Sequence, residues 1–178
     1  MIIIKNIRSE KADSRVRALQ NISDSFAYLV KNETDAFTLT NSVLDDSYVR
    51  RHGSVEDLSF ICAEKALLNA CILYLWHMTK RSEQKFSNVI KLIDTGFPYE
   101  EDCKRTALDK MFEEVEEYDP SNPAVTEYRL FRKCSGRMMT KVMLAVSESL
   151  NDYKGRYDKR PLRDEFKSKK SKEEGADQ

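Results

Sequence analysis

A run of nineteen residues, Phe60–Met78, is the most apolar stretch of a chain in which about a third of the residues are charged. Only four residues interrupt it: Glu64, Lys65, Asn69 and His77. At about 100° per residue, its apolar side chains fall on nearly every side of a helix, and a helix that is apolar all round is buried in a domain centre or in a membrane. The run therefore constrains the class of protein that this chain can form.

The charges inside the run favour a domain centre. Glu64 and Lys65 would be expensive on a helix that faces lipid. The longest uninterrupted apolar stretch is also far shorter than the ~20 residues that cross a bilayer. We therefore expect residues 60–78 to form the central helix of a soluble domain in the cytoplasm. The N-terminal MIIIK is too short for the apolar region of a signal peptide, so we expect no targeting signal.

Composition favours an all-α fold. The chain has 178 residues, which is long enough to bury a sizeable core. Five glycines and four prolines leave few turn formers for a many-stranded sheet, whereas Leu, Lys, Glu, Met and Ala supply good helix formers. The sequence predicts a compact multi-helix bundle, of about six or seven helices, around the buried central helix.

Apolar periodicity divides the chain into three parts. Residues 7–30 repeat apolar side chains at helical intervals, which predicts an N-terminal helical arm over residues 1–32. The main all-helical domain spans residues 33–150, and Asn32 or Thr34 can cap its first helix. The apolar pattern fails from residue 151, so we expect residues 151–178 to be a charged and mostly disordered tail.

Two later helices have clear start signals. Thr106 can cap a helix whose apolar stripe is backed by an acidic face, from Asp109 to Glu117, which we interpret as solvated. Asn122 and Pro123 fit the cap and first position of the last helix. Its apolar phase persists past Ser135-Gly136, which favours one kinked helix of about 27 residues over two.

The motifs that most enzymes need are absent. The chain contains no GxxxxGK[ST], GxGxxG, HExxH or GxSxG pattern. Its two histidines are far apart, and its paired carboxylates lie on a face predicted to be solvated. We therefore expect no enzymatic activity, no catalytic residues and no cofactor.

The four cysteines favour reduced thiols over a metal site. Cys62, Cys71, Cys103 and Cys134 form no CxxC pair, and their spacing from the histidines does not support zinc. Buried thiols packed as small hydrophobic groups are typical of cytoplasmic proteins. We expect no bound metal.

Glu64 is the acid inside the apolar run. One interpretation is an internal polar contact that satisfies a partly buried carboxylate. The other is a functional acid. The residues alone leave both open.

A basic row follows the predicted last helix, opposite its apolar face. Its members recur every four residues and would present four cations over about 18 Å; they are Arg129, Lys133, Arg137 and Lys141, with Arg132 beside them. Three readings stay open: simple solvation, contact with an acidic protein surface, and contact with DNA phosphates. A second basic cluster, Lys80, Arg81 and Lys85, follows the central helix. Because Lys plus Arg and Asp plus Glu both number 30, the chain has no overall basic excess.

Several short patterns lie in a fixed order along residues 33–150. They are Glu64 with Leu67 and Leu68, the pair Tyr74-Leu75, the step Phe86-Ser87, the series Leu108, Asp109, Phe112, Val115, Asp119 and Pro120, and the series Tyr128, Phe131 and Gly136. In this order the chain resembles the all-alpha domain of the type IV secretion coupling proteins. These are the membrane-anchored ATPases that deliver the relaxase–DNA substrate in bacterial conjugation, and the likeness is closest to forms common in Gram-positive and related mobile elements.

The resemblance implies a substrate-recognition module. In that family the all-alpha domain lies at the cytoplasmic end of the motor domain and is thought to recognise the relaxosome. The family's membrane anchor and Walker segments are not in this sequence, so the resemblance implies the recognition domain alone, as an excised piece or a separate gene. It implies no catalytic residue.

Three functions therefore stay open at this stage. The leading one is binding of a relaxase or relaxosome accessory protein, with single- or double-stranded DNA as a further ligand. The second is direct DNA binding through the basic helix face. The third is a structural role, in which copies of the chain self-associate within the ring of a parent ATPase by pairing acidic and basic faces.

Overall fold

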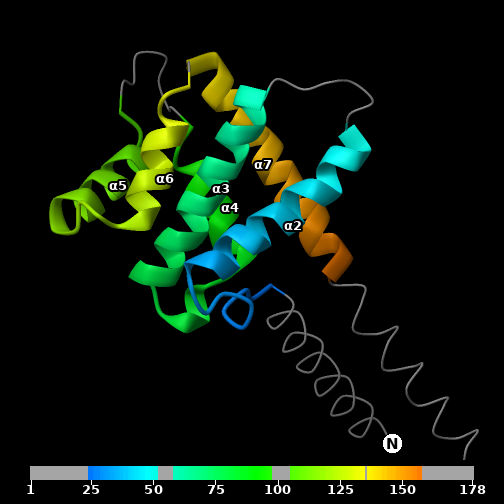
Figure 1. Cartoon of the computed structure of the whole chain (residues 1–178), viewed down its shortest axis with the longest axis horizontal. Helices are drawn as coiled ribbons and strands as arrows, with labels where there is room; N and C mark the ends of the chain where they lie inside the picture. Colours follow the sequence, from blue (N-terminus) through cyan, green and yellow to red (C-terminus); the bar gives the residue numbers. More distant parts are fainter. Residues whose placement is uncertain (1–23, 52–57, 98–104, 135, 158–178) are drawn as a thin grey trace, which may run out of the picture. The chain divides into compact units, whose positions relative to one another are not determined.

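The computed structural model describes residues 24–51, 58–97, 105–134 and 136–157. The chain divides into two units, one of residues Ser25–Tyr153 and one that contains Met1–Asp24 and Lys154–Gln178. Every named element of the described ranges is helical, which confirms the predicted all-α fold (Figure 1). The elements are α2 (Glu33–Arg51), α3 (Leu58–Met78), the short 3-10 turn η1 (Arg81–Glu83), α4 (Phe86–Asp94), α5 (Ala107–Tyr118), α6 (Pro123–Phe131) and α7 (Gly136–Tyr157).

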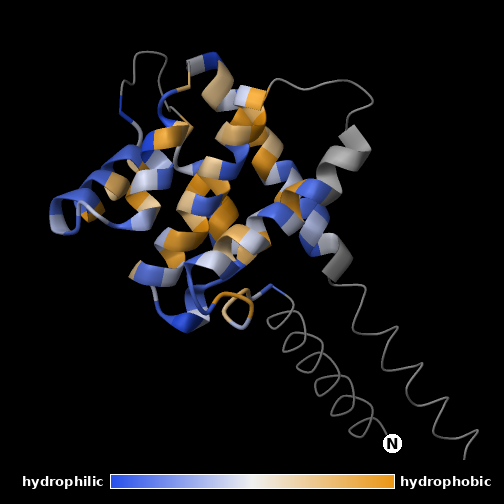
Figure 2. Cartoon of the chain, in the orientation of Figure 1, coloured by the Kyte–Doolittle hydropathy of each residue, from blue (hydrophilic) through white to orange (hydrophobic). Residues whose placement is uncertain are grey.

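The predicted central helix is confirmed as α3. It packs most extensively against α6 and also contacts α2 and α4. Five side chains within two turns point to different sides of the helix and are fully buried: Leu67, Leu68, Cys71, Ile72 and Leu73. In Figure 2 the hydrophobic residues concentrate in the middle of the bundle along α3 and α4, and the visible side of α2 is mostly hydrophilic.

Length and composition alone would also allow α3 to cross a membrane, and among the described helices it is the one that meets this criterion. A core helix of a globular bundle meets the same criterion. The burial of α3 by its neighbouring helices accounts for its apolar surface without lipid.

A helix was predicted over residues 7–30. For residues 24–30, which the structure describes, this prediction is wrong, because they form a turn. Ser25 makes an isolated β-bridge to Lys85, and the Phe26 amide donates to the Gln84 carbonyl at 3.0 Å. Phe26 is fully buried, with its ring centroid 5.6 Å from that of Phe86. Burial of a large aromatic side chain contributes more than local helix propensity, so Phe26 determines the path of the chain here. Residues 7–23 lie outside the described ranges.

Local capping signals correctly place three helix starts. The Asn32 side chain accepts the Asp35 amide at 2.9 Å at the start of α2. Thr106 and Asp109 form a reciprocal capping box at the start of α5. Asn122 accepts the Ala124 amide, with Pro123 as the first residue of α6.

The prediction of one long last helix is wrong, because α6 ends at Phe131 and a separate helix, α7, begins at Gly136. The amides of Lys133 and Cys134 bond to carbonyls three residues back, which forms a tight turn. Glycine at position 136 weakens the helix there by about 1 kcal/mol. The break leaves α6 packed on α3 and α5, while α7 continues as far as Tyr157, beyond residue 150 where the tail was expected to begin. Tyr153 of α7 is buried, with its ring 5.5 Å from that of Phe86.

Gly96 lies at the close approach between the end of α4, α5 and α7. An added Cβ would lie 2.9 Å from the Leu108 side chain, 2.9 Å from the Met143 sulfur and 3.0 Å from the Ile93 carbonyl oxygen. We predict that Gly96→Ala lowers the free energy of unfolding by about 1–2 kcal/mol, because the backbone carbonyl cannot move aside cheaply. Chemical denaturation measures this change.

The control is Gly155→Ala in α7, where an added Cβ meets nothing within 4 Å. This control should raise the free energy of unfolding by up to about 1 kcal/mol, because alanine is the better helix former. A Gly96→Ala variant as stable as the wild type would contradict the predicted close packing.

Candidate functional site

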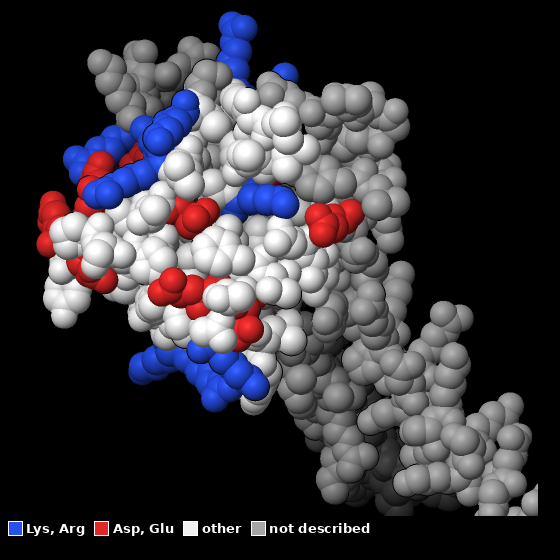
Figure 3. Space-filling model, viewed as in Figure 1, with Lys and Arg blue, Asp and Glu red and all other residues white. Residues whose placement is uncertain are grey.

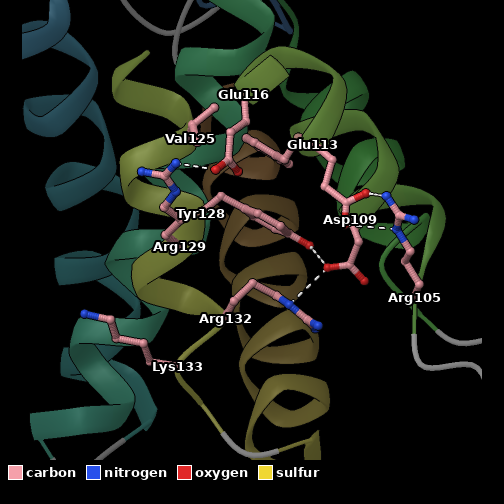
Figure 4. A pocket seen from close by; sticks show the side chains of 10 residues that line it. Arg105, Asp109, Glu113, Glu116, Val125, Tyr128, Arg129, Arg132 and Lys133 are labelled. Carbon is pink, nitrogen blue, oxygen red and sulfur yellow. Dashed lines mark hydrogen bonds and ion pairs between the residues drawn. The ribbon is translucent and has the colours of Figure 1, made fainter. Parts of the chain in front are cut away.

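A groove with a volume of about 480 Å³ opens between α5 and α6 (Figure 4). Its floor is aromatic and apolar, and its rim carries four cations and three acids. The lining residues are Phe112, Val125 and Tyr128, the cations Arg105, Arg129, Arg132 and Lys133, and the acids Asp109, Glu113 and Glu116. A second hollow, lined also by Glu117 and Pro120, shares Arg105, Glu113 and Glu116 with the groove.

The carboxylate of Asp109 joins the two walls of the groove. Its Oδ1 accepts the Tyr128 hydroxyl at 2.8 Å and contacts Arg132 Nε at 3.0 Å. Its Oδ2 accepts both the backbone amide and the hydroxyl of Thr106 at 2.8 Å. Asp109 is 4% exposed, so its carboxylate is a buried charge, and each of its two oxygens accepts from two donors. The prediction that the acidic face of α5 is solvated is therefore wrong at Asp109.

The environment of Asp109 lowers its pKa. Burial raises the pKa, but the Thr106 backbone bond, the Tyr128 and Thr106 hydroxyls and the charge of Arg132 together outweigh burial. The pKa of Tyr128 is raised, first by burial and then by its hydrogen bond to the Asp109 carboxylate. At neutral pH the pair is therefore a charged acceptor with a neutral donor.

The floor of the groove is an aromatic stack. The rings of Phe112 and Tyr128 lie 4.0 Å apart between centroids and 5° from parallel. Tyr74 of α3 and Phe131 of α6 flank the stack at 5.3 Å and 5.9 Å. The stack joins α3, α5 and α6 and holds the Tyr128 hydroxyl in position beneath Asp109.

Two ion pairs span the rim of the groove. Arg105 bonds to Glu113, with Nε 2.9 Å from Oε1, and Arg129 of α6 bonds to Glu116 of α5. All four side chains are at least two-fifths exposed, so each pair contributes little to stability and can exchange with a ligand or partner.

The structure separates the predicted basic residues into groups. Arg129 pairs with Glu116 and Arg132 pairs with Asp109, and both acids belong to α5. The predicted continuous row along one helix is wrong, because α6 ends at Phe131 and α7 begins at Gly136. Lys133, Arg137 and Lys141 are exposed, and in the described part of the chain none of the three has an ion pair. Lys80 and Arg81 lie elsewhere, at the turn between α3 and α4. In Figure 3 basic side chains gather over α5 and α6, among acids, and again over that turn.

Three of the α5 acids pair within the chain. The contact between copies weighed from the sequence used this acidic face and the basic face at 129–141. Three of its charges, Asp109, Glu113 and Glu116, are matched by arginines of the same chain. A contact between copies through these acids would have to break the ion pairs that they make within the chain.

Two polar residues of the central helix, Glu64 and Asn69, lie in the interior. Glu64 is 1% exposed and is not part of the groove lining. Asn69 donates from Nδ2 to Glu127 Oε2 of α6 at 3.4 Å. Burial raises the pKa of Glu127, and the bond from Asn69 partly offsets this. Asn69 therefore helps to set the register of α3 against α6.

Sequence reasoning did not identify several groove residues. Arg105, Glu113 and Glu116 have no local signal, because their pairing depends on how α5 and α6 come together. The Thr106–Asp109 capping box was a usable signal for the position of Asp109, but Tyr128 is 19 residues away.

No group of three or more His, Cys, Asp or Glu side chains suited to a metal ion is found in the described ranges. Cys62, Cys71 and Cys134 are free thiols. The expected burial is confirmed for Cys71, whose pKa it raises, but it is wrong for Cys62, which is exposed, and Cys134 is half-buried. Comparison of the chain with protein-family models, with curated proteins and with solved structures finds no match.

We predict that Asp109→Asn lowers the free energy of unfolding by about 1–3 kcal/mol, because an amide cannot accept all the donors that meet the carboxylate. Tyr128→Phe should cost about 1–2 kcal/mol, since it removes one of those donors. Urea denaturation measures both changes. Glu117→Gln on the exposed side of α5 is the control and should stay within about 0.5 kcal/mol of the wild type. Equal stability of Asp109→Asn and wild type would refute the central place of this carboxylate.

The lowered pKa of Asp109 also predicts a pH dependence. A carboxyl with a lower pKa in the folded than in the unfolded state stabilises the fold above its ordinary range, about pH 4. That contribution disappears as the pH falls through the folded-state value. The stability difference between wild type and Asp109→Asn should therefore shrink below about pH 4. A difference that stays constant from neutral to acid pH would contradict the assignment.

Proposed function

We propose that this chain is a substrate-recognition domain of the kind found in type IV secretion coupling proteins, and that it binds a relaxase or a relaxosome accessory protein. The ordered resemblance over residues 33–150 supports this proposal. The residues that carry the resemblance are largely structural: Leu67, Leu68, Phe112 and Phe131 are buried, and Asp109 anchors Tyr128. Recognition is therefore assigned to exposed residues around this framework.

The observation that carries the proposal is the α6–α7 surface, defined as Leu130, Lys133, Arg137, Lys141 and Leu144. Its three cations are exposed and have no ion pair in the described part of the chain, unlike the arginines of the groove. Because Arg137, Lys141 and Leu144 are spaced by four and three residues, they share one face of α7. Leu130 and Leu144 are 46% and 52% exposed.

This mixture of cations with exposed leucines favours a protein partner. Apolar anchors among charged groups are typical of protein interfaces, whereas phosphate contacts are made by cations and hydrogen-bond donors and use no exposed leucines. The break between α6 and α7 also removes the regular four-residue spacing that would have followed a DNA backbone. The expected partner is a protein surface with exposed acids around an apolar centre.

We further propose that the chain acts by binding and not by catalysis, on the cytoplasmic side of the membrane and without a cofactor. Asp109 supports this view. Its two oxygens are occupied by hydrogen bonds from Thr106 and Tyr128 and by Arg132, as a structural anchor requires.

The proposal predicts that the purified chain binds a relaxosome protein encoded on the same mobile element. Arg137→Glu with Lys141→Glu should weaken this binding about tenfold or more, because like charges then face the acidic partner. Biolayer interferometry against the immobilised relaxase and accessory proteins measures the change.

The matched control is Lys91→Glu with Lys110→Glu, which makes the same charge change on exposed positions of α4 and α5. It should bind as the wild type does. Failure of the wild type to bind any relaxosome protein would reject the proposal. A DNA gel shift that only the Arg137→Glu, Lys141→Glu variant loses, with no protein binding, would instead support the direct DNA-binding function.

A further inference from the structure

A buried hydrogen-bond acceptor on the central helix lacks a donor. Asn69 of α3 is 5% exposed. Its amide nitrogen Nδ2 donates to Oε2 of Glu127 on α6 at 3.4 Å, but its carbonyl oxygen Oδ1 is buried and has no hydrogen-bond partner in the described part of the chain. A buried polar atom that loses its bond to water without a replacement is costly, so the unpaired Oδ1 needs an explanation.

The group beside Asn69 is a carboxyl, whose protonation changes what it can bind. An ionised carboxylate only accepts hydrogen bonds, so it serves the Nδ2 donor and leaves Oδ1 without a partner. Rotating the amide by half a turn does not help, because it sets Oδ1 against the carboxylate. A protonated carboxyl has one O–H donor and one carbonyl acceptor, which are complementary to the acceptor and the donors of an amide. One proton on Glu127 therefore satisfies both side chains.

The surroundings of Glu127 favour its neutral form. The side chain is half-buried, and burial raises its pKa, which the bond from Asn69 offsets only in part. Among the described residues no cation forms an ion pair with Glu127. The cost of burying the charge is therefore not repaid by a neighbouring positive charge.

The charged groups of the helices packed against α6 have other partners or make no ion pair with Glu127. On α5, the three acids of the groove pair with arginines. On α3, Lys65 lies four residues before Asn69 and so on the same side of the helix, but the described ranges contain no ion pair between it and Glu127. Glu64, one residue earlier, is a buried acid that would disfavour a second charge nearby.

We infer that Glu127 and Asn69 form a proton-linked latch between α3 and α6, in which the protonated carboxyl donates from Oε1 to Oδ1 of Asn69 and accepts from Nδ2 through Oε2. When Glu127 ionises, its proton goes to water, the latch loses one of its two hydrogen bonds, and Oδ1 again has no donor. The contact between α3 and α6 is the most extensive in the bundle, and Figure 1 shows the two helices side by side. The latch makes this contact stronger in acid and weaker in base.

The latch acts on a helix that also contributes to the α6–α7 surface. Leu130 lies three residues after Glu127 on α6, and Lys133 lies in the turn that follows. Protonation of one carboxyl thus regulates how firmly this helix is held on the core. The latch does not depend on the proposed function, because it is formed within one copy and can be tested without a partner.

Glu127→Gln in the full chain tests the latch, because its amide donates to Oδ1 at every pH as the protonated acid does. In the wild type the contribution of the latch is fully present below the ordinary pKa of Glu, about 4.3, and is lost as the pH rises through the higher folded-state value. The two proteins should therefore be equally stable at about pH 4. At about pH 9 the unfolding constant of the variant should be about three- to tenfold smaller, as expected for one buried hydrogen bond. Urea denaturation followed by circular dichroism measures both values.

Two further variants separate the latch from the simple removal of a charge. Glu117→Gln removes an exposed charge of α5 and should stay within about twofold of the wild-type unfolding constant at every pH. Asn69→Ala removes Oδ1, so the gain from Glu127→Gln should vanish when the two substitutions are combined. Carbon-13 NMR of the wild-type carboxyl groups follows the proton directly, and the midpoint for Glu127 should lie above about 4.3.

Equal stability of Glu127→Gln and the wild type at the higher pH, or a Glu127 midpoint at or below the ordinary value, would overturn the latch. A gain that persists in the Asn69→Ala background would assign the effect to relief of a half-buried charge and would overturn it as well. The NMR titration uses the wild type, so it decides the question even if Asn69→Ala does not fold. None of these measurements involves a relaxosome protein, so failure of the latch and failure of the proposed function can be told apart.

Discussion

The rest of the structure depends on one constraint, which is that α3 is apolar on all sides and must be covered on all sides. Helices α2, α4 and α6 provide that cover, and the most extensive contact is with α6. Burial of a large aliphatic side chain contributes about 1.5–3 kcal/mol, so a helix with so many fully buried residues dominates the stability of the bundle. The hydrogen bond between Asn69 and Glu127 adds a polar contact between α3 and α6 within this apolar packing.

Asp109 extends this arrangement from the core to the surface. Its carboxylate begins α5 through the Thr106 capping box, and it also binds Tyr128 of α6 and Arg132 of the following turn. A buried carboxylate with several donors is costly to disturb, because loss of one partner leaves the others poorly matched. Arg132 is the C-cap residue of α6, so this contact lies where the chain leaves α6 for the turn before α7.

The elements that could be predicted from the sequence are those with local causes. The all-round apolar run at Phe60–Met78 and the caps at Asn32, Thr106 and Asn122 act within a few residues, and the structure confirms them. The turn around Phe26 could not be predicted, because it depends on the Gln84 carbonyl far along the chain. The break before Gly136 preserved the apolar phase, so periodicity gave no sign of it. For the same reason, the basic residues near α6 and α7 looked equivalent, although Arg129 and Arg132 pair with α5 and Lys133, Arg137 and Lys141 do not.

The structure thus separates a framework from the surfaces that it presents. The residues that resemble the coupling-protein domain lie mainly in the framework, and the proposed recognition of a relaxosome protein rests on the α6–α7 surface. Hydrogen exchange of the backbone amides, with and without the cognate relaxosome protein, tests this account most directly. It predicts slower exchange over residues 136–144 in the presence of that protein and unchanged exchange in α3. Unchanged exchange over residues 136–144, with protection elsewhere, would contradict it.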